Sequence, residues 1–132
     1  MAKAKPNLDW LTKAQRQLNK DSAFRKLGST DLKLGLLIGD VARLVTFEAF
    51  EISSILEMDS EDVRDADLVI NMSVREWNAY LRQRKAGKAA SLMSVDVETP
   101  VVYAQNPLKR LLFERYNLSI QAFVDRGAKL AA

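Results

Sequence analysis

Alternation of apolar and polar residues predicts three strands between residues 31 and 56. The first run, residues 31–38, places every second residue on one face of an extended segment. Gly39-Asp40 is a turn signal, and β-branched and aromatic residues dominate residues 41–48 and continue through residues 50–56. Three short runs joined by tight turns predict an antiparallel meander. The inward face of the later strands stays undecided, because their apolar residues do not follow one alternation: Val45, Phe47, Phe50 and Ile52.

Helical spacing of apolar residues predicts a helix before this meander. Residues 8–18 carry such a spacing behind a cap at Asn7 or Asp9. Residues 22–27 add a further turn, and Gly28 supplies the left-handed stop that often follows one. The chain therefore begins, in our prediction, with helical structure that packs beside the strands.

Further helices are predicted after the meander, where the cap signals are clearest. Ser73, followed three residues later by Glu76, forms a capping box that starts a helix over residues 74–84. Asn106-Pro107 predicts the cap and first turn of a helix that reaches Tyr116. Ser119 is predicted to cap a separate last helix, which Gly127 weakens by about 1 kcal/mol relative to alanine.

The remaining segments complete the predicted fold class. Residues 57–67 form a polar, acidic connection, and residues 67–72 form a compact apolar strand. Residues 92–97 and 99–103 predict a last strand, which Pro100 confines to a sheet edge or a break. This order predicts an α+β fold in which helices cover a mostly antiparallel five-stranded sheet. We expect a single domain over residues 1–132.

Composition removes most catalytic chemistry. The 132 residues include no cysteine and no histidine, which excludes disulfides, thiol nucleophiles and the commonest general base and metal ligand. Ser53 and Ser54 lack a histidine to activate them, and no glycine-rich phosphate loop is present. We therefore expect no enzyme activity, no metal site and no cofactor. A serine activated by lysine is the alternative that the sequence leaves open.

Hydropathy and charge bear on location and partners. No apolar run approaches the roughly 20 residues of a membrane-spanning helix, and the basic start, residues 1–6, has no apolar stretch behind it. We therefore expect a soluble, cytoplasmic protein without a secretory signal. The net charge of +3 is spread along the chain without a nucleic-acid-binding motif, so nucleic acid is not an expected partner.

The order of elements and the segment Asp65-Ala-Asp-Leu-Val-Ile-Asn-Met-Ser-Val-Arg-Glu-Trp-Asn-Ala-Tyr-Leu81 resemble the sterol carrier protein type 2 family. In that family an acidic strand of this kind runs into a helix capped by serine or threonine that carries an early aromatic residue, here Trp77. The resemblance extends over residues 20–85. The second half departs from it, since residues 98–107 replace the usual glycine- and lysine-rich strand, and the peroxisomal Ser-Lys-Leu ending is absent.

This resemblance implies an apolar cavity between the sheet and the helices that takes a sterol, a fatty acid or a fatty acyl thioester. Such ligands gain about 0.8 kcal/mol per methylene group removed from water, so a carrier needs apolar lining above all. The same apolar stripes also fit the buried faces of ordinary packed helices. The residues predicted to line the cavity are Trp77, Leu81, Leu92, Met93, Leu111, Leu112, Ile120, Phe123 and Val124.

A basic run at the end of the helix over residues 74–84 suggests a further partner. It comprises Arg82, Arg84, Lys85 and Lys88. These cations complement the helix dipole, and the alternative is transient contact with an anionic membrane surface or with ligand phosphates. The sequence also leaves open an interaction subunit with the same fold and a filled cavity, which acts as a homodimer or docks a partner enzyme.

Overall fold

A five-stranded sheet organises the chain, of which the computed structural model describes residues 5–131. The strands lie in the order β3-β2-β1-β4-β5, with β1 and β4 parallel and the other three pairs antiparallel. They are β1 (Thr30–Ile38), β2 (Val41–Ala49), β3 (Glu51–Met58), β4 (Leu68–Met72) and β5 (Val102–Tyr103). The predicted fold class, a mostly antiparallel sheet with helices, is confirmed.

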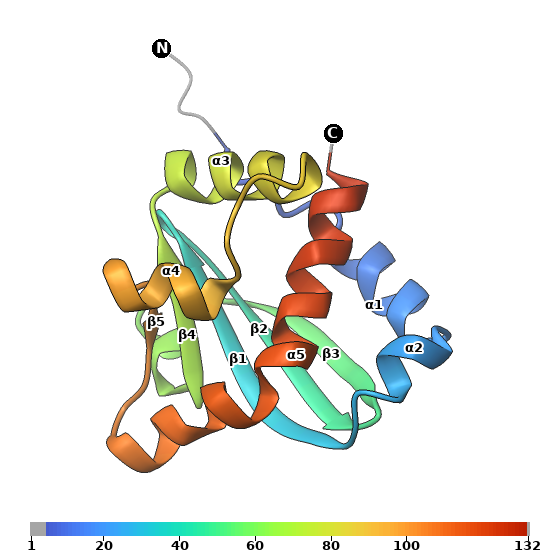
Figure 1. Cartoon of the computed structure of the whole chain (residues 1–132). Helices are drawn as coiled ribbons and strands as arrows, with labels where there is room; N and C mark the ends of the chain where they lie inside the picture. The colour runs from blue at the N-terminus through green and yellow to red at the C-terminus, as the bar shows by residue number, and fades with distance from the viewer. Residues whose placement is uncertain (1–4, 132) are drawn as a thin grey trace.

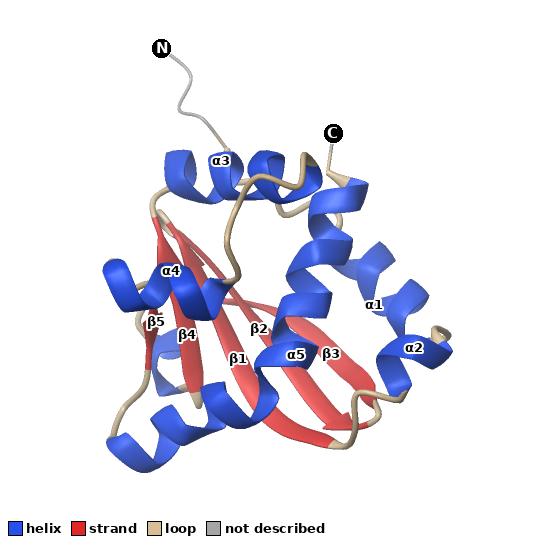
Figure 2. Ribbon diagram, in the orientation of Figure 1, coloured by secondary structure: helices blue, strands red, loops and turns tan. Residues whose placement is uncertain are grey.

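The α-helices cover one face of this sheet (Figures 1 and 2). In Figure 2 the helices α4 and α5 lie in front of the strands, and α3 crosses one end of the sheet. One large apolar cluster fills the space between these helices and the sheet. The helices are α1 (Leu11–Asn19), α2 (Ser22–Arg25), α3 (Val74–Lys85), α4 (Leu92–Glu98) and α5 (Pro107–Leu130), with a short 3₁₀ helix, η1 (Asp62–Asp65).

The opposite face of the sheet carries a smaller apolar cluster under η1. Val63 of η1 is fully buried there, against Leu37 and Val69 among others. Gly35 makes this contact possible, because a Cβ atom at that position would lie 2.7 Å from Cγ2 of Val63. The acidic connection that we predicted after the meander therefore docks on the sheet through apolar side chains, of which Val63 is the most deeply buried.

A β-bulge explains why alternation failed to define the inward face of β2 and β3. Thr46 pairs with Ser54, whereas the adjacent Phe47 pairs with Ile52, so Ser53 is an extra residue on β3. Val45 and Phe47 lie two apart on β2 and point into the main core by ordinary alternation, whereas the bulge brings Ile55 of β3 to the same side as Ile52.

Helix α1 covers part of the edge of the sheet. The side chains of Gln15 and Asn19 each donate a hydrogen bond to the carbonyl oxygen of Ile52, at 2.9 and 3.0 Å. The amide of Ile52 in turn donates to Oδ1 of Asn19, at 2.8 Å. Because β3 is an outermost strand, these bonds satisfy main-chain groups that would otherwise face solvent.

The predicted cap signals are confirmed at α3 and α5. Oγ of Ser73 accepts from the amide of Glu76, whose carboxylate accepts from the amide of Ser73, so the capping box is complete. Oδ1 of Asn106 accepts from the amide of Lys109, and Pro107 occupies the first turn of α5. Both helices therefore begin where the sequence places them.

The predicted strand over residues 92–97 is wrong, because this segment forms α4. Oγ of Ser91 accepts from the amide of Ser94 and caps the helix. Within α4, the buried carboxylate of Asp96 accepts from the amides of Val101 and Val102, both at 2.8 Å. These two hydrogen bonds hold the start of β5 beside α4. The two-residue edge strand β5 is the part of the predicted strand that the structure contains.

The two predicted C-terminal helices are one helix, α5, which continues through Ser119. Ser119 is buried, and its hydroxyl lies 3.5 Å from that of Thr30 on β1. Gly127 is buried against Trp10, and a Cβ atom there would lie 2.6 Å from Cε2 of the indole and closer still to Cζ2 and Cη2. The glycine therefore allows close contact between α5 and the segment before α1.

We expect Gly127→Ala to destabilise the protein, although alanine is the better helix former by about 1 kcal/mol. Overpacking of a filled core costs about 1–3 kcal/mol, which outweighs that gain. Urea denaturation measures the free energy of unfolding. In the background Trp10→Phe, whose smaller ring leaves room for the new methyl group, the same substitution should lose most of its cost. A stabilising Gly127→Ala in the wild-type background would contradict the close contact.

Within residues 5–131, no helix has both the length and the apolar character that crossing a membrane requires. Residues 1–4 and 132, which enter the predictions about a secretory signal and a peroxisomal ending, lie outside the described residues.

Candidate functional site

The nine residues predicted to line a cavity separate into three groups. Six are fully buried in the main cluster: Trp77, Leu81, Leu92, Ile120, Phe123 and Val124. Met93 and Leu112 are partly buried against that cluster. Leu111 lies on the outside of α5, with 54% of its surface exposed. The structure thus brings eight of the nine together in or beside one core, and their contact with a ligand stays a prediction.

Aromatic rings fill the middle of that core. The ring centroid of Phe123 lies 5.3 Å from that of Trp10 and 6.0 Å from that of Phe47, with tilted and edge-on geometry. Trp10 stacks on Trp77 at 6.3 Å, and both indole nitrogens donate to the carbonyl oxygen of Asn7. Trp77 and Phe123, two of the predicted ligand contacts, therefore pack against protein in this conformation.

An open pocket of about 430 Å³ adjoins this core between α3, α4 and the end of β4. Its volume falls within the range of about 300–1,000 Å³ that is typical of small-molecule sites. None of the nine predicted residues lines it. Its apolar walls come from Met72, Ala79, Tyr80, Ala89, Ala90, Val95 and Val101, and its polar lining comes from Glu76, Gln83, Lys88 and Thr99.

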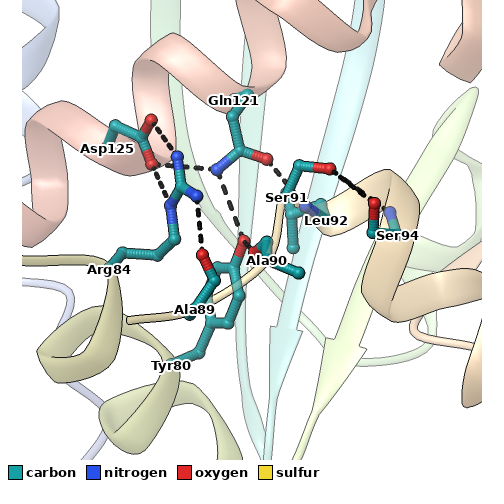
Figure 3. A network of polar contacts seen from close by, with 9 residues as sticks. All are labelled: Tyr80, Arg84, Ala89, Ala90, Ser91, Leu92, Ser94, Gln121 and Asp125. Atoms are coloured by element: carbon teal, nitrogen blue, oxygen red, sulfur yellow. Dashed lines mark hydrogen bonds and ion pairs between the residues drawn. The ribbon is translucent and has the colours of Figure 1, made fainter. Parts of the chain in front are cut away.

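A network of polar contacts holds one wall of this pocket, the loop of residues 86–91 (Figure 3). The hydroxyl of Tyr80 donates to the carbonyl oxygen of Ala90 at 2.8 Å, and Arg84 donates to that of Ala89 at 3.0 Å. From α5, Oε1 of Gln121 accepts from the amide of Leu92 at 2.7 Å. These bonds attach the C-terminal half of the loop and the start of α4 to α3 and α5, and we call them the loop network.

An ion pair between α3 and α5 anchors the loop network. Arg84 donates to both carboxylate oxygens of Asp125, at 2.8 and 2.6 Å. This bidentate bond is the main reason that the pKa of Arg84 is raised. Burial raises the pKa of Tyr80 further above its ordinary value of 10.0, and the protonated hydroxyl donates to the loop. Gln121 donates to Asp125 at 2.9 Å and completes the network.

The basic run has a different role at each position. Arg84 is committed to Asp125, and Nζ of Lys85 donates to the carbonyl oxygen of Ala131 at 3.2 Å. Arg82 is exposed on α3 and lies outside the pocket lining. Lys88 is the member of the run that lines the pocket. No pattern in the sequence selects it over its neighbours.

Comparison with known proteins finds a solved structure with a similar fold. The chain is similar in structure to a conserved hypothetical protein from Thermus thermophilus that is described as a possible sterol carrier protein. The TM-score is 0.70 over 100% of this chain and 94% of that chain, with 18% sequence identity. At this identity the likeness concerns the fold. No protein-family model matches the chain, and no curated protein matches it.

Sequence reasoning missed the pocket because its lining does not follow a periodic pattern. Ala89, Ala90, Thr99 and Val101 lie in connections, where neither helical nor strand spacing marks the inward residues. One signal was present for the loop network. Gln121 and Asp125 are polar residues four apart within the apolar stripe of α5, and polar residues on a buried face need partners.

Proposed function

We propose that the protein binds an apolar lipid and carries it without a catalytic step. The observation that carries this proposal is the pocket between α3 and α4, whose walls are mostly apolar and whose lining includes one cation, Lys88, and one anion, Glu76. A hydrocarbon chain placed there is stabilised by about 0.8 kcal/mol for each methylene group that is removed from water. A carboxylate or phosphate head group is held at the pocket mouth by Lys88.

The pocket deepens where the loop network opens. Tyr80 and Ala90 are joined across the wall, and the amide of Leu92 is held by Gln121 just beyond it. Release of these bonds lets the loop move away from α5 and gives a long ligand access to Trp77 and Leu92. The buried residues that the sequence predicted to line a cavity then form the inner end of the same site.

The likeness in fold supports the ligand class. The Thermus thermophilus protein is described as a possible sterol carrier protein, and its fold covers this chain over its whole length. A sterol, a fatty acid and a fatty acyl thioester all fit an apolar site with a cation at its mouth. We further propose that Lys88 contacts anionic head groups when the lipid is exchanged with a membrane surface.

The test measures lipid uptake. Native mass spectrometry detects lipid that purifies with the protein, and displacement of a pyrene-labelled dodecanoic acid gives the dissociation constant. Ala79→Trp fills the pocket from α3, and we expect it to weaken binding at least tenfold, a difference of about 1.4 kcal/mol. Arg82→Trp is the matched control on the same helix, outside the pocket lining. Equal binding by both variants, or no uptake by the wild type, contradicts the proposal.

A second candidate is a non-catalytic interaction subunit, which the filled core and the outer side of α5 favour. Leu108, Leu111 and Leu118 are exposed on that helix. Exposed apolar side chains that share one element are typical of a surface that binds another protein. In the experiment above, absence of lipid together with a stable dimer in sedimentation velocity supports this candidate over the carrier.

A further inference from the structure

A second hollow lies on the face of the sheet opposite the large helices. Its volume is about 260 Å³, and its floor consists of Leu37 on β1 and Val69 on β4. Arg64 of η1 lies on one side, and Tyr103 and Gln105 lie on the side of β5. The lining combines an apolar floor with a few polar side chains, which is the usual composition of a small-molecule site.

The strand pairing and the docking of η1 build this hollow. Val69 pairs with Gly35 of β1 on one side and with Tyr103 of β5 on the other. Val63 occupies the space above Gly35 and is fully buried. This contact holds η1 next to Val69, the residue paired with Gly35. The next residue, Arg64, therefore lies at the wall, and the strip over β4 and β5 stays uncovered.

The charge of the hollow is positive. Arg64 is the charged residue in its lining, which contains no aspartate or glutamate. Within residues 5–131 no ion pair of Arg64 is found. Asn71 is an exposed residue of the lining, and its side chain has no hydrogen-bond partner in the described part of the chain. An arginine and an amide at an apolar floor match a carboxylate attached to an apolar group.

We propose that this hollow binds a monocyclic aromatic carboxylate. The ring lies on Leu37 and Val69, beside the side chain of Tyr103, which is 48% exposed and whose hydroxyl donates to the carbonyl oxygen of Pro100. The carboxylate pairs with the guanidinium of Arg64 and accepts a hydrogen bond from Asn71. Because the sheet separates this hollow from the pocket between α3 and α4, the inference does not depend on the proposed lipid site.

The volume sets the size and the affinity of the ligand. The hollow is smaller than the range of about 300–1,000 Å³ for larger ligands, which excludes a sterol and favours a molecule with a single ring. A ligand this small, bound through one ion pair and one apolar face, has a dissociation constant on the order of 1 mM.

The experiment is a titration of the full chain, labelled with ¹⁵N, with phenylacetate as the probe. We expect saturable shifts of the backbone amide signals of Leu37, Val69, Asn71, Tyr103 and Gln105. Benzyl alcohol, which keeps the ring and lacks the charge, should bind at least about tenfold more weakly. Arg64→Gln should weaken phenylacetate binding by a similar factor, whereas Arg75→Gln, an exposed arginine of α3 outside the hollow, should not.

Three results overturn the proposal. One is the absence of saturable shifts up to about 20 mM phenylacetate, well above the expected dissociation constant. Another is equal binding by wild type and Arg64→Gln, with the dispersion of the spectrum showing that the variant is folded. The third is that the shifts map to the pocket between α3 and α4. The variant Ala79→Trp separates the two sites, because it should reduce lipid uptake and leave the phenylacetate shifts unchanged.

Discussion

Phe123→Ala should lower the free energy of unfolding by about 3–5 kcal/mol. The ring is fully buried between Trp10 and Phe47, and neither neighbour can move into the space that it leaves without losing its own contacts. Chemical denaturation followed by tryptophan fluorescence or circular dichroism measures the change. Its size reports whether the side chain belongs to a packed core or faces an empty cavity.

Leu111→Ala is the control on the same helix. Leu111 was predicted to line the same cavity, but it is exposed, so we expect its substitution to change stability by no more than about 0.5 kcal/mol. A loss below about 1 kcal/mol for Phe123→Ala, close to that of the control, would show that the ring has space beside it. That outcome would contradict the packing described for the core and favour an internal ligand cavity.

Asp96→Ala should have the second large effect, a loss of about 3 kcal/mol at neutral pH. The carboxylate is buried and accepts from the amides of Val101 and Val102, and it pairs with Arg110 of α5. Alanine leaves two main-chain donors without their acceptor at the start of β5. Glu98→Ala, at an exposed position of the same helix, is the control and should cost no more than about 0.5 kcal/mol.

The effect of Asp96→Ala should depend on pH. Burial raises the pKa of Asp96, but the amide of Val102, the guanidinium of Arg110 and the amide of Val101 together lower it by more, so it lies below the ordinary value of 3.8. A carboxyl group with a lowered pKa in the folded state stabilises the protein above its unfolded pKa, and this contribution is lost as the pH falls through the folded pKa. The difference between wild type and variant should therefore be complete at about pH 6 and shrink below about pH 3.8. A difference that stays constant as the pH falls from about 6 to well below about 3.8 would contradict the assignment.

The fold was predictable wherever local signals and tertiary packing agree. The capping box of Ser73 and Glu76 and the alternation in β1 each specify an element without help from the rest of the chain. The segment of α4 misled because Val95 and Val97 alternate with polar residues, as in a strand. The helix is stabilised by the cap at Ser91 and by the distant partners of Asp96, which periodicity does not report.

The candidate site was less predictable, because packing decides which apolar residues line a cavity. Phe123 and Val124 have the spacing of a lining, but other rings fill the space beside them. The pocket instead takes its walls from Ala89 and Ala90, whose small side chains leave volume that larger ones would occupy. Which side of a helix meets empty space depends on the path of neighbouring loops, and the sequence contains no local signal for that path.

The side chains of Gln15 and Asn19 also govern how copies of this chain can associate. They occupy the main-chain groups of Ile52 on the outermost strand, where an incoming strand from another molecule would have to bind. Pairing of an incoming strand with this part of β3 therefore requires α1 to detach first, and α1 contributes Leu11, Ala14 and Leu18 to the core. Aggregation through the Ile52 end of β3 is thereby tied to partial unfolding, because the helix that blocks this position also completes the interior.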